Sequence, residues 1–350
     1  MQENYIHSMS GCHLDREKAW FIDGNMNYLI SEDMVTHSIQ FVKKVFKKYN
    51  SKRRLYCGVV KKNEKIYLFP NGAEKMLVYN TETAETTEID VDFQSNTHNK
   101  SGNSYFGWQE GNELYYFRRG YKSLYCMDTT NMAFFTIDYN KNSSLDDEWA
   151  CYWNWRTEKY KDKVLLYSLI DKCFFIYDQE NKKLISTMQH SETVDDYTVW
   201  GEKIVFINKK YELWIYDGTV CNMIADLMKY GYQKNNGLSL YVKDNQLYLI
   251  DRKTGSVGKV DLEAEFSMEK VREGNSDNEI VAIVIRQSYG FVQRKDGTLY
   301  CYNGANHFQG IVQSNMENIP EEVYKFDMIT ECSEYTIKDL FKCVTLDKAE

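Results

Sequence analysis

Carboxylates close to aromatic side chains are the residues of this sequence best suited to acid–base chemistry. Two acidic runs fall in predicted loops: Asp146, Asp147 and Glu148 in the first, Asp195 and Asp196 in the second. The neighbouring predicted strands hold the aromatic residues Trp108, Tyr152, Trp153, Trp155 and Trp200. Glycoside hydrolysis uses paired carboxylates, and aromatic rings commonly stack on sugars, so one candidate function is a carbohydrate-active enzyme. The alternative is that these rings only fill the protein interior.

Basic pairs form a second set of candidate site residues, and they recur at fixed positions. They stand five to seven residues after the start of a recurring apolar segment: Arg118-Arg119, Lys209-Lys210, Arg252-Lys253 and Arg294-Lys295. Eight of 21 residues at these positions are basic, where the composition predicts about 2.6. The excess indicates a positive rim for an anionic partner. The alternative is that lysine-rich hairpin tips are merely solvated.

Histidine and cysteine show no arrangement typical of metal binding or nucleophilic catalysis. The six histidines share no ligand spacing, and the nine cysteines include no C-x-x-C pair. Cys126 and Cys301 occupy strand positions where other copies of the repeat hold Val78 or Ile215, which predicts buried thiols. We therefore expect no metal, no cofactor and no nucleophilic relay.

The composition predicts a cytoplasmic protein with a large core. Aromatic residues make up 15% of the chain, and its formal charge of −8 argues against general nucleic-acid binding. The first residues, Met1–Asn4, lack the positive and apolar character of a signal peptide, and no apolar run is long enough for a membrane-spanning helix. We expect no nucleic-acid or membrane partner.

The elements that must position these residues come from one repeat. Its clearest copy is an apolar strand at 203–207, a polar turn, and a second apolar strand from 212 that closes on Asp217. The seven copies begin at Lys18, Lys65, Glu113, Lys163, Lys203, Gln246 and Tyr289, with spacings of 47, 48, 50, 40, 43 and 43 residues. The closing polar residues are Asp33, Asn80, Asp128, Asp178, Asp217, Asp261 and Asn303.

Each copy has a further predicted strand before it and another after it. For the third copy these are 105–108 and 133–139, and for the fourth 151–155 and 184–188. Four short strands per repeat are typical of the antiparallel blade of a β-propeller. The sequence therefore predicts an all-β chain whose residues 1–313 form a seven-bladed β-propeller, with six or eight blades as the alternative.

Two of the copies resemble a known repeat. The segments LWIYDGT at 213–219 and LVYNTET at 77–83 are similar to the third strand of Kelch-type blades, as in the galactose-oxidase propeller. Where Kelch blades have two glycines after the second strand, this chain has Pro70-Asn71, Arg118-Arg119 or Asn208-Lys209. The resemblance implies the fold and assigns no functional residue.

The two ends of the chain are predicted to pack on this scaffold. The first strand of the first blade is expected at 9–14. This leaves residues 3–8 to pair with the last blade and so close the ring of blades. Residues 314–350 form a C-terminal extension, where a capping box at Thr336 and Asp339 predicts a short helix that acts as a plug or binds a partner.

The favoured function is non-enzymatic. The loops between copies are long and polar: 43–54, 95–103, 141–148, 190–196, 229–236 and 272–278. Long loops on a rigid scaffold commonly carry binding sites. The sequence thus favours a binding or scaffold protein that presents this charged, loop-rich face to a protein or to an anionic or glycan ligand.

Overall fold

The computed structural model covers most of the predicted repeat. It describes residues 9–14, 17–23, 27–33, 35–36, 38–45, 55–70, 73, 75–91, 104–118, 124–137, 156–234, 236–243, 246–262, 267–272, 280–286, 289–294, 299–303, 312–313 and 315–317. These residues lie almost entirely in β-strands and the turns that join them.

Three sheets belong to the first of two compact units, which comprises Met1–Ala150, Tyr289–Cys301 and Val312–Glu350. The first sheet has the order β1 (Met9–Leu14), β2 (Lys18–Asp23), β3 (Tyr28–Asp33), β4 (Ser38–Lys44) and β29 (Asn315–Glu317). The second contains β5 (Tyr56–Lys62), β6 (Lys65–Pro70), β7 (Lys75–Asn80) and β8 (Thr86–Asp90). The third contains β9 (Ser104–Glu110), β10 (Glu113–Arg118), β11 (Leu124–Asp128) and β12 (Phe134–Ile137).

Three more sheets belong to the second unit, Cys151–Ser288 with Tyr302–Ile311. The first of them contains β13 (Glu158–Tyr160), β14 (Lys163–Ser168), β15 (Cys173–Asp178) and β16 (Lys183–Gln189). The next contains β17 (Val194–Trp200), β18 (Lys203–Asn208), β19 (Glu212–Tyr216) and β20 (Cys221–Asp226). The third contains β21 (Leu238–Lys243), β22 (Gln246–Asp251), β23 (Val257–Asp261) and β24 (Ser267–Arg272).

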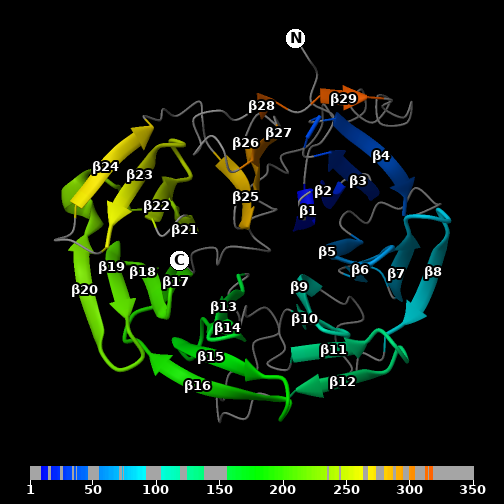
Figure 1. Cartoon of the computed structure of the whole chain (residues 1–350), viewed down its shortest axis with the longest axis horizontal. Helices are drawn as coiled ribbons and strands as arrows, with labels where there is room; N and C mark the ends of the chain where they lie inside the picture. The colour runs from blue at the N-terminus through cyan, green and yellow to red at the C-terminus, as the bar shows by residue number, and fades with distance from the viewer. Residues whose placement is uncertain are drawn as a thin grey trace. The chain divides into compact units, whose positions relative to one another are not determined.

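The remaining sheet has the order β25 (Ile280–Arg286), β26 (Tyr289–Arg294), β27 (Leu299–Asn303) and β28 (Val312–Gln313). The chain is therefore all-β, and six of its sheets are four-stranded antiparallel meanders that resemble propeller blades. Within a sheet the strands follow one another in chain order, as β5 to β8 do in cyan in Figure 1.

Successive sheets of a unit pack face to face, and the core lies between them. In the first unit, Trp20 and Ile22 of β2 share one cluster with Ile66 and Leu68 of β6. In the second unit, Tyr167 of β14 and Phe206 of β18 belong to a single cluster. The second strand of a sheet is thus covered on both faces. This explains why its sequence is continuously apolar instead of alternating.

Exposure differs between the second and the fourth strand of a sheet. In β8 four of five residues are exposed, whereas β18 buries five of six. The predicted second strands begin at the residues expected, and six of the seven closing polar residues end a third strand; the other, Asp217, follows β19 directly. The predicted first strand at 9–14 is also confirmed as β1.

The closing polar residues form turns, as expected for Asp and Asn at these positions. Oδ1 of Asp33 accepts hydrogen bonds from the backbone N–H groups of Val35 and Thr36. Oδ1 of Asp217 accepts from Thr219 and Val220 in the same way. Each bond satisfies backbone donors that the strand ladder leaves unpaired.

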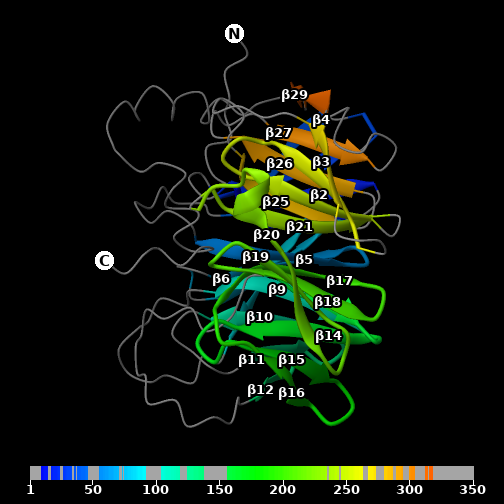
Figure 2. The ribbon, with the colours of Figure 1, turned by 90° about the vertical axis from the view of Figure 1, so that its left-hand side faces the viewer.

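The described part of the C-terminal region adds one strand to the first sheet. Residues 315–317 form β29, which pairs in parallel with Ser38, Ile39 and Gln40 of β4; Figures 1 and 2 both show β29, in orange, beside β4. The predicted helix near Thr336 and the closing segment 3–8 lie outside the described residues. So does 151–155, where the first strand of the fourth copy is predicted, whereas the first strand of that sheet is β13 at Glu158–Tyr160.

Among the described residues, helix is confined to one short element. The 3-10 helix η1 (Leu227–Tyr230) begins after Asp226, whose Oδ1 accepts from the N–H of Met228, and it ends at Gly231 with a φ of 89°. None of the described helical segments is long and apolar enough to cross a membrane.

The Asp217 turn makes stability depend on pH in a defined direction. The N–H groups of Val220 and Thr219, with the Thr219 hydroxyl, lower the pKa of this carboxyl to about 2. Because the folded-state pKa lies below the ordinary value, its stabilising effect is present above about pH 4 and is lost as the pH falls towards 2. We expect Asp217→Ala to lower the free energy of unfolding near neutral pH, and the difference from the wild type to shrink below about pH 4.

Urea titrations followed by tryptophan fluorescence, at several pH values between neutrality and about pH 3, would test this. Asp217→Asn is the control, because it keeps an acceptor oxygen for the turn and should lose less stability at neutral pH. A difference between Asp217→Ala and the wild type that stays constant over this range would contradict the assignment.

Candidate functional site

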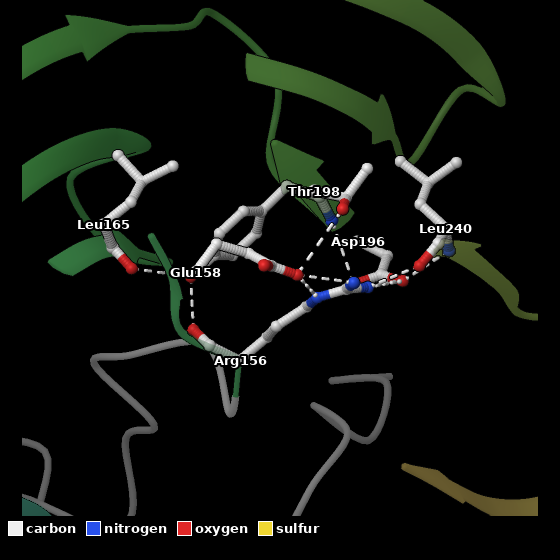
Figure 3. A network of polar contacts seen from close by, with 7 residues as sticks. Arg156, Glu158, Leu165, Asp196, Thr198 and Leu240 are labelled. Carbon is white, nitrogen blue, oxygen red and sulfur yellow. Dashed lines mark hydrogen bonds and ion pairs between the residues drawn. The ribbon is translucent and has the colours of Figure 1, made fainter. Parts of the chain in front are cut away.

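The principal buried polar group of the second unit is an arginine held by two carboxylates (Figure 3). Arg156 lies two residues before the start of β13, and its side chain is 12% exposed. Its Nε and Nη2 lie 2.7 Å and 2.6 Å from Oε1 of Glu158, and its Nη1 lies 3.0 Å from Oδ2 of Asp196. One guanidinium therefore joins β13 to β17, the first strands of two sheets.

The carboxylate of Asp196 is fully engaged. Its side chain is 3% exposed. Oδ1 accepts from Nη1 of Arg156 at 3.2 Å and from the N–H of Tyr197 at 2.9 Å, and Oδ2 accepts from Nη1 of Arg156 at 3.0 Å and from the N–H of Leu240 at 2.8 Å. Both oxygens are therefore occupied by hydrogen bonds, two of them from a cationic guanidinium.

The same two side chains supply hydrogen-bond partners for backbone groups at a free sheet edge. Leu240 is in β21, which is the first strand of its sheet and pairs with β22 on one side only. Its N–H donates to Asp196, and its carbonyl accepts from Nη1 of Arg156 at 2.7 Å. The ion pair thus takes the place of a neighbouring strand at this point and links β13, β17 and β21.

Tyr197 completes the network from the following position of β17. Its hydroxyl donates to the carbonyl of Arg156, and it lies 3.4 Å from the carbonyl of Leu165 in β14. Burial, reinforced by the charge of Glu158, raises the pKa of Tyr197 well above its ordinary value. The phenol is therefore a hydrogen-bond donor at physiological pH and not a base.

The charge state of Arg156 follows from its neighbours. Burial alone lowers the pKa of a guanidinium, but the charges of Asp196 and Glu158 outweigh this effect and raise the pKa of Arg156. The buried group is thus a permanent cation with two anionic partners. Glu158 is the more open of these, at 26% exposed, so one end of the network meets solvent.

Asp195, the other predicted acid, lies in a different environment. The register of β17 against β18 shifts between Val194 and Asp196, which makes Asp195 the extra residue of a β-bulge. Burial raises the pKa of Asp195, against the lowering effect of the positive charges of Arg252 and Lys209. Asp195 therefore faces the basic turns, while Asp196 faces Arg156.

The prediction that Asp195 and Asp196 lie in an acidic loop is wrong. The predicted loop 190–196 extends only to Thr193, because β17 begins at Val194 and both acids belong to that strand. Consecutive aspartates are unfavourable in a strand on propensity alone. Here the bulge places the two side chains in different surroundings, and Arg156 compensates the charge of Asp196.

Two of the basic pairs are described with their side chains, and both lie on turns between second and third strands. Lys209 and Lys210 follow β18 and are exposed; Nζ of Lys210 is 2.7 Å from Glu192. Lys253 is exposed in the turn after β22, whereas Arg252 is half-buried. A Cβ on Gly237 would lie 2.6 Å from the guanidinium of Arg252, so that group packs against the glycine.

The other predicted site residues cannot be assigned a geometry. Arg118 ends β10 and Arg294 ends β26, and nothing further is described of their side chains. The remaining candidates lie outside the described residues: Arg119, Lys295, Asp146, Asp147, Trp153 and Trp155. Of the other predicted aromatic residues, Trp108 and Trp200 are 5% and 6% exposed, which makes them core residues.

Sequence reasoning missed Arg156, the centre of the network. Its partners Glu158 and Asp196 are two and 40 residues away, and the pairing with Asp196 has no periodic signal in the sequence. Among the residues with assigned positions, no group of three or more His, Cys, Asp or Glu side chains could hold a metal ion.

Comparisons with known proteins define the fold and nothing finer. No protein-family model matches the chain, and no curated protein matches its sequence. A catalytically inactive virginiamycin B lyase from Staphylococcus aureus is similar with a TM-score of 0.62 and 9% identity, over 86% of this chain and 96% of that one. YCF48 bound to D1 peptide gives 0.61 and 10%, over 87% and 95%.

BamB from Moraxella catarrhalis gives a TM-score of 0.52 and 9% identity, over 85% of this chain and 84% of that one. At these identities the likeness concerns the fold alone. It shows that the chain has a β-propeller fold, and it does not single out the Kelch type.

The ion pair should be strongly coupled to folding of the second unit. Asp196→Leu alone leaves the guanidinium of Arg156 without its most buried partner, and Arg156→Met alone leaves the carboxylate of Asp196 without its cation; breaking a buried pair from one side typically costs about 3–5 kcal/mol. Because Arg156→Met combined with Asp196→Leu removes both charges, the double variant should lose less stability than the sum of the single variants.

Urea unfolding of the wild type, the two single variants and the double variant would measure this coupling. Lys75→Ala is the matched control, because Lys75 and Asp90 form an ion pair at 3.1 Å with side chains 43% and 89% exposed. Such exposed pairs are worth less than about 1 kcal/mol. Additive losses for Arg156 and Asp196 would show that the two side chains do not act as a pair.

Proposed function

We propose that this chain is a non-catalytic binding protein that presents the turns between second and third strands to an anionic macromolecular partner. The observation that carries the proposal is the exposure of Lys209 and Lys253 at corresponding turns of two successive sheets. Each lies in a short turn anchored by the residue that ends the second strand, so its position is fixed by the scaffold.

The anchoring of the two turns is alike. Oδ1 of Asn208 accepts from the N–H of Lys210 at 3.0 Å, and Oδ1 of Asp251 accepts from the N–H of Lys253 at 3.0 Å. The positive charges of Arg252 and Lys209, which follow the second strands of different sheets, both act to lower the pKa of Asp195. The two turns therefore contribute to one positive region, although the chain as a whole carries a formal charge of −8.

The carbohydrate-active alternative requires a pair of carboxylates that can exchange protons. Asp196 is unsuited to this role, because it is buried and both of its oxygens accept hydrogen bonds from Arg156 and from backbone N–H groups. Among similar structures, one is of a lyase and one is of a complex with a peptide. The fold is thus compatible with either class of function, and the proposal depends on the site.

We also propose that the seven sheets are seven blades of Kelch type. The seven copies of the sequence repeat each supply the second and third strands of one sheet, which supports this blade number. The Kelch-like segments coincide with β7 and β19, which are third strands of their sheets, as the resemblance requires.

Charge reversal of the exposed lysines tests the proposed binding surface. We expect Lys209→Glu combined with Lys253→Glu to lower the salt concentration at which the chain elutes from a sulfonated resin, and to leave the unfolding midpoint nearly unchanged. Lys210 and Arg252 are left in place because they contact Glu192 and Gly237.

The matched control is Lys182→Glu combined with Lys183→Glu, which reverses two exposed lysines where the turn after β15 meets the first residue of β16. It changes the net charge by the same amount on a turn between third and fourth strands. Equal elution shifts for the two double variants would mean that retention follows net charge alone, which would refute the proposed surface.

A further inference from the structure

The chain itself adds a strand to the free edge of a fourth strand. β29 pairs in parallel with β4, where Asn315, Met316 and Glu317 lie opposite Ser38, Ile39 and Gln40. The contact covers only the beginning of β4. Just beyond it, the register of β4 against β3 shifts between the pairs Leu29–Lys43 and Ile30–Phe41, a β-bulge.

β20 repeats this arrangement without the added strand. Its register against β19 shifts between the pairs Leu213–Ala225 and Trp214–Met223, which places a bulge at the corresponding point. The two hairpins can be aligned at their closing aspartates, Asp33 and Asp217. The residue before each aspartate pairs with the fourth strand: Glu32 with Ile39, and Tyr216 with Cys221. Residues 220–222 therefore correspond to the residues of β4 that hold β29. In the described part of the chain, no strand pairs with the free edge of β20.

Exposed apolar side chains gather along this edge. Val220 and Met223 are each 51% exposed, and in η1 Met228 and Tyr230 are 47% and 45% exposed. Only two other large apolar side chains of the described residues, Val35 and Ile185, are exposed to this degree. Val220 and Met223 thus expose apolar surface at the start of β20, and Met228 and Tyr230 expose more in η1, which follows the strand directly.

Other fourth strands protect the corresponding positions with charge, as free edges in soluble proteins commonly do. The exposed charged residues there are Lys183 in β16, Glu269 in β24 and Glu85 just before β8. Residues 220–222 carry no charge. In β12 the corresponding Phe134 and Phe135 are half-buried, so that edge offers less apolar surface.

We propose that the free edge of β20 binds an extended peptide segment of a partner protein as a fifth strand, parallel to β20, in the way that β29 lies on β4. Backbone hydrogen bonds to the edge beyond Val220, whose own N–H and carbonyl are engaged in the Asp217 turn, supply affinity. The exposed side chains of Val220 and Met223 favour a segment with apolar side chains. The ends of the edge differ in charge: Asp217 stands before it, and exposed Lys229 stands after it. A parallel segment with an acidic residue at its C-terminal end fits this polarity.

A phage-displayed library of random dodecapeptides, selected on the full chain, tests the proposal. Peptides that also bind the Val220→Lys variant are removed, since lysine at an edge opposes strand addition. We expect the remaining peptides to be apolar, to bind Met223→Lys at least about tenfold more weakly, and to bind the Ile185→Lys control as they bind the wild type. Amide hydrogen exchange should slow at Cys221 when peptide is present, because the N–H of the preceding Val220 already donates to Asp217.

Three results would overturn the proposal. The first is a selection in which no peptide distinguishes the wild type from Val220→Lys. The second is protection of the turns at Lys209 and Lys253 in place of Cys221. The third is self-association of the chain that Val220→Lys abolishes, which would make a second copy the occupant of this edge. Retention on sulfonated resin does not involve β20, so this proposal and the charged surface can fail separately.

Discussion

Polar backbone groups on the free edge of β21 need partners, and the ion pair of Arg156 with Asp196 supplies them at Leu240. This constraint organises the second unit. A carboxylate buried among apolar strands would be costly alone, but here it is matched by a guanidinium and two backbone donors, and the cation is matched in turn by Glu158. The result ties the first strands of three sheets together through side chains instead of through a shared ladder. Burial of such a pair contributes positional accuracy more surely than net stability.

The same problem, an edge without a neighbouring strand, recurs at the other side of every sheet, and the chain meets it in several ways. β4 is covered by β29, β16 and β24 carry charged side chains, and β20 is left open beside Val220 and Met223. The repeated sheet is thus a constant frame on which the edges vary. Because a sheet edge offers both hydrogen bonds and apolar surface, variation there is a direct route to different binding properties.

Charge is distributed by the turns and not by the composition. The formal charge of −8 describes the whole chain, yet the turns after β18 and β22 present lysines to solvent and surround Asp195 with positive potential. Neighbouring acids in the sequence consequently have opposite roles. Asp196 belongs to the buried network around Arg156, whereas Asp195 is the extra residue of the bulge in β17, with the charges of Arg252 and Lys209 nearby. The numbers of acidic and basic residues in the sequence indicate neither role.

The sequence by itself determined the strands, their grouping in fours and the residues that end them, because each depends on local patterns: apolar runs, turn-forming Asp and Asn, and a fixed offset within each copy. It also placed Lys209-Lys210 and Arg252-Lys253 on turns between second and third strands. Only the tertiary structure decided which side chains surround Asp195 and Asp196. The bulge at Asp195, the capture of Asp196 by Arg156 and the addition of β29 to β4 join residues far apart in the chain. Such contacts follow from how sheets pack, and a single sequence carries no periodic signal for them.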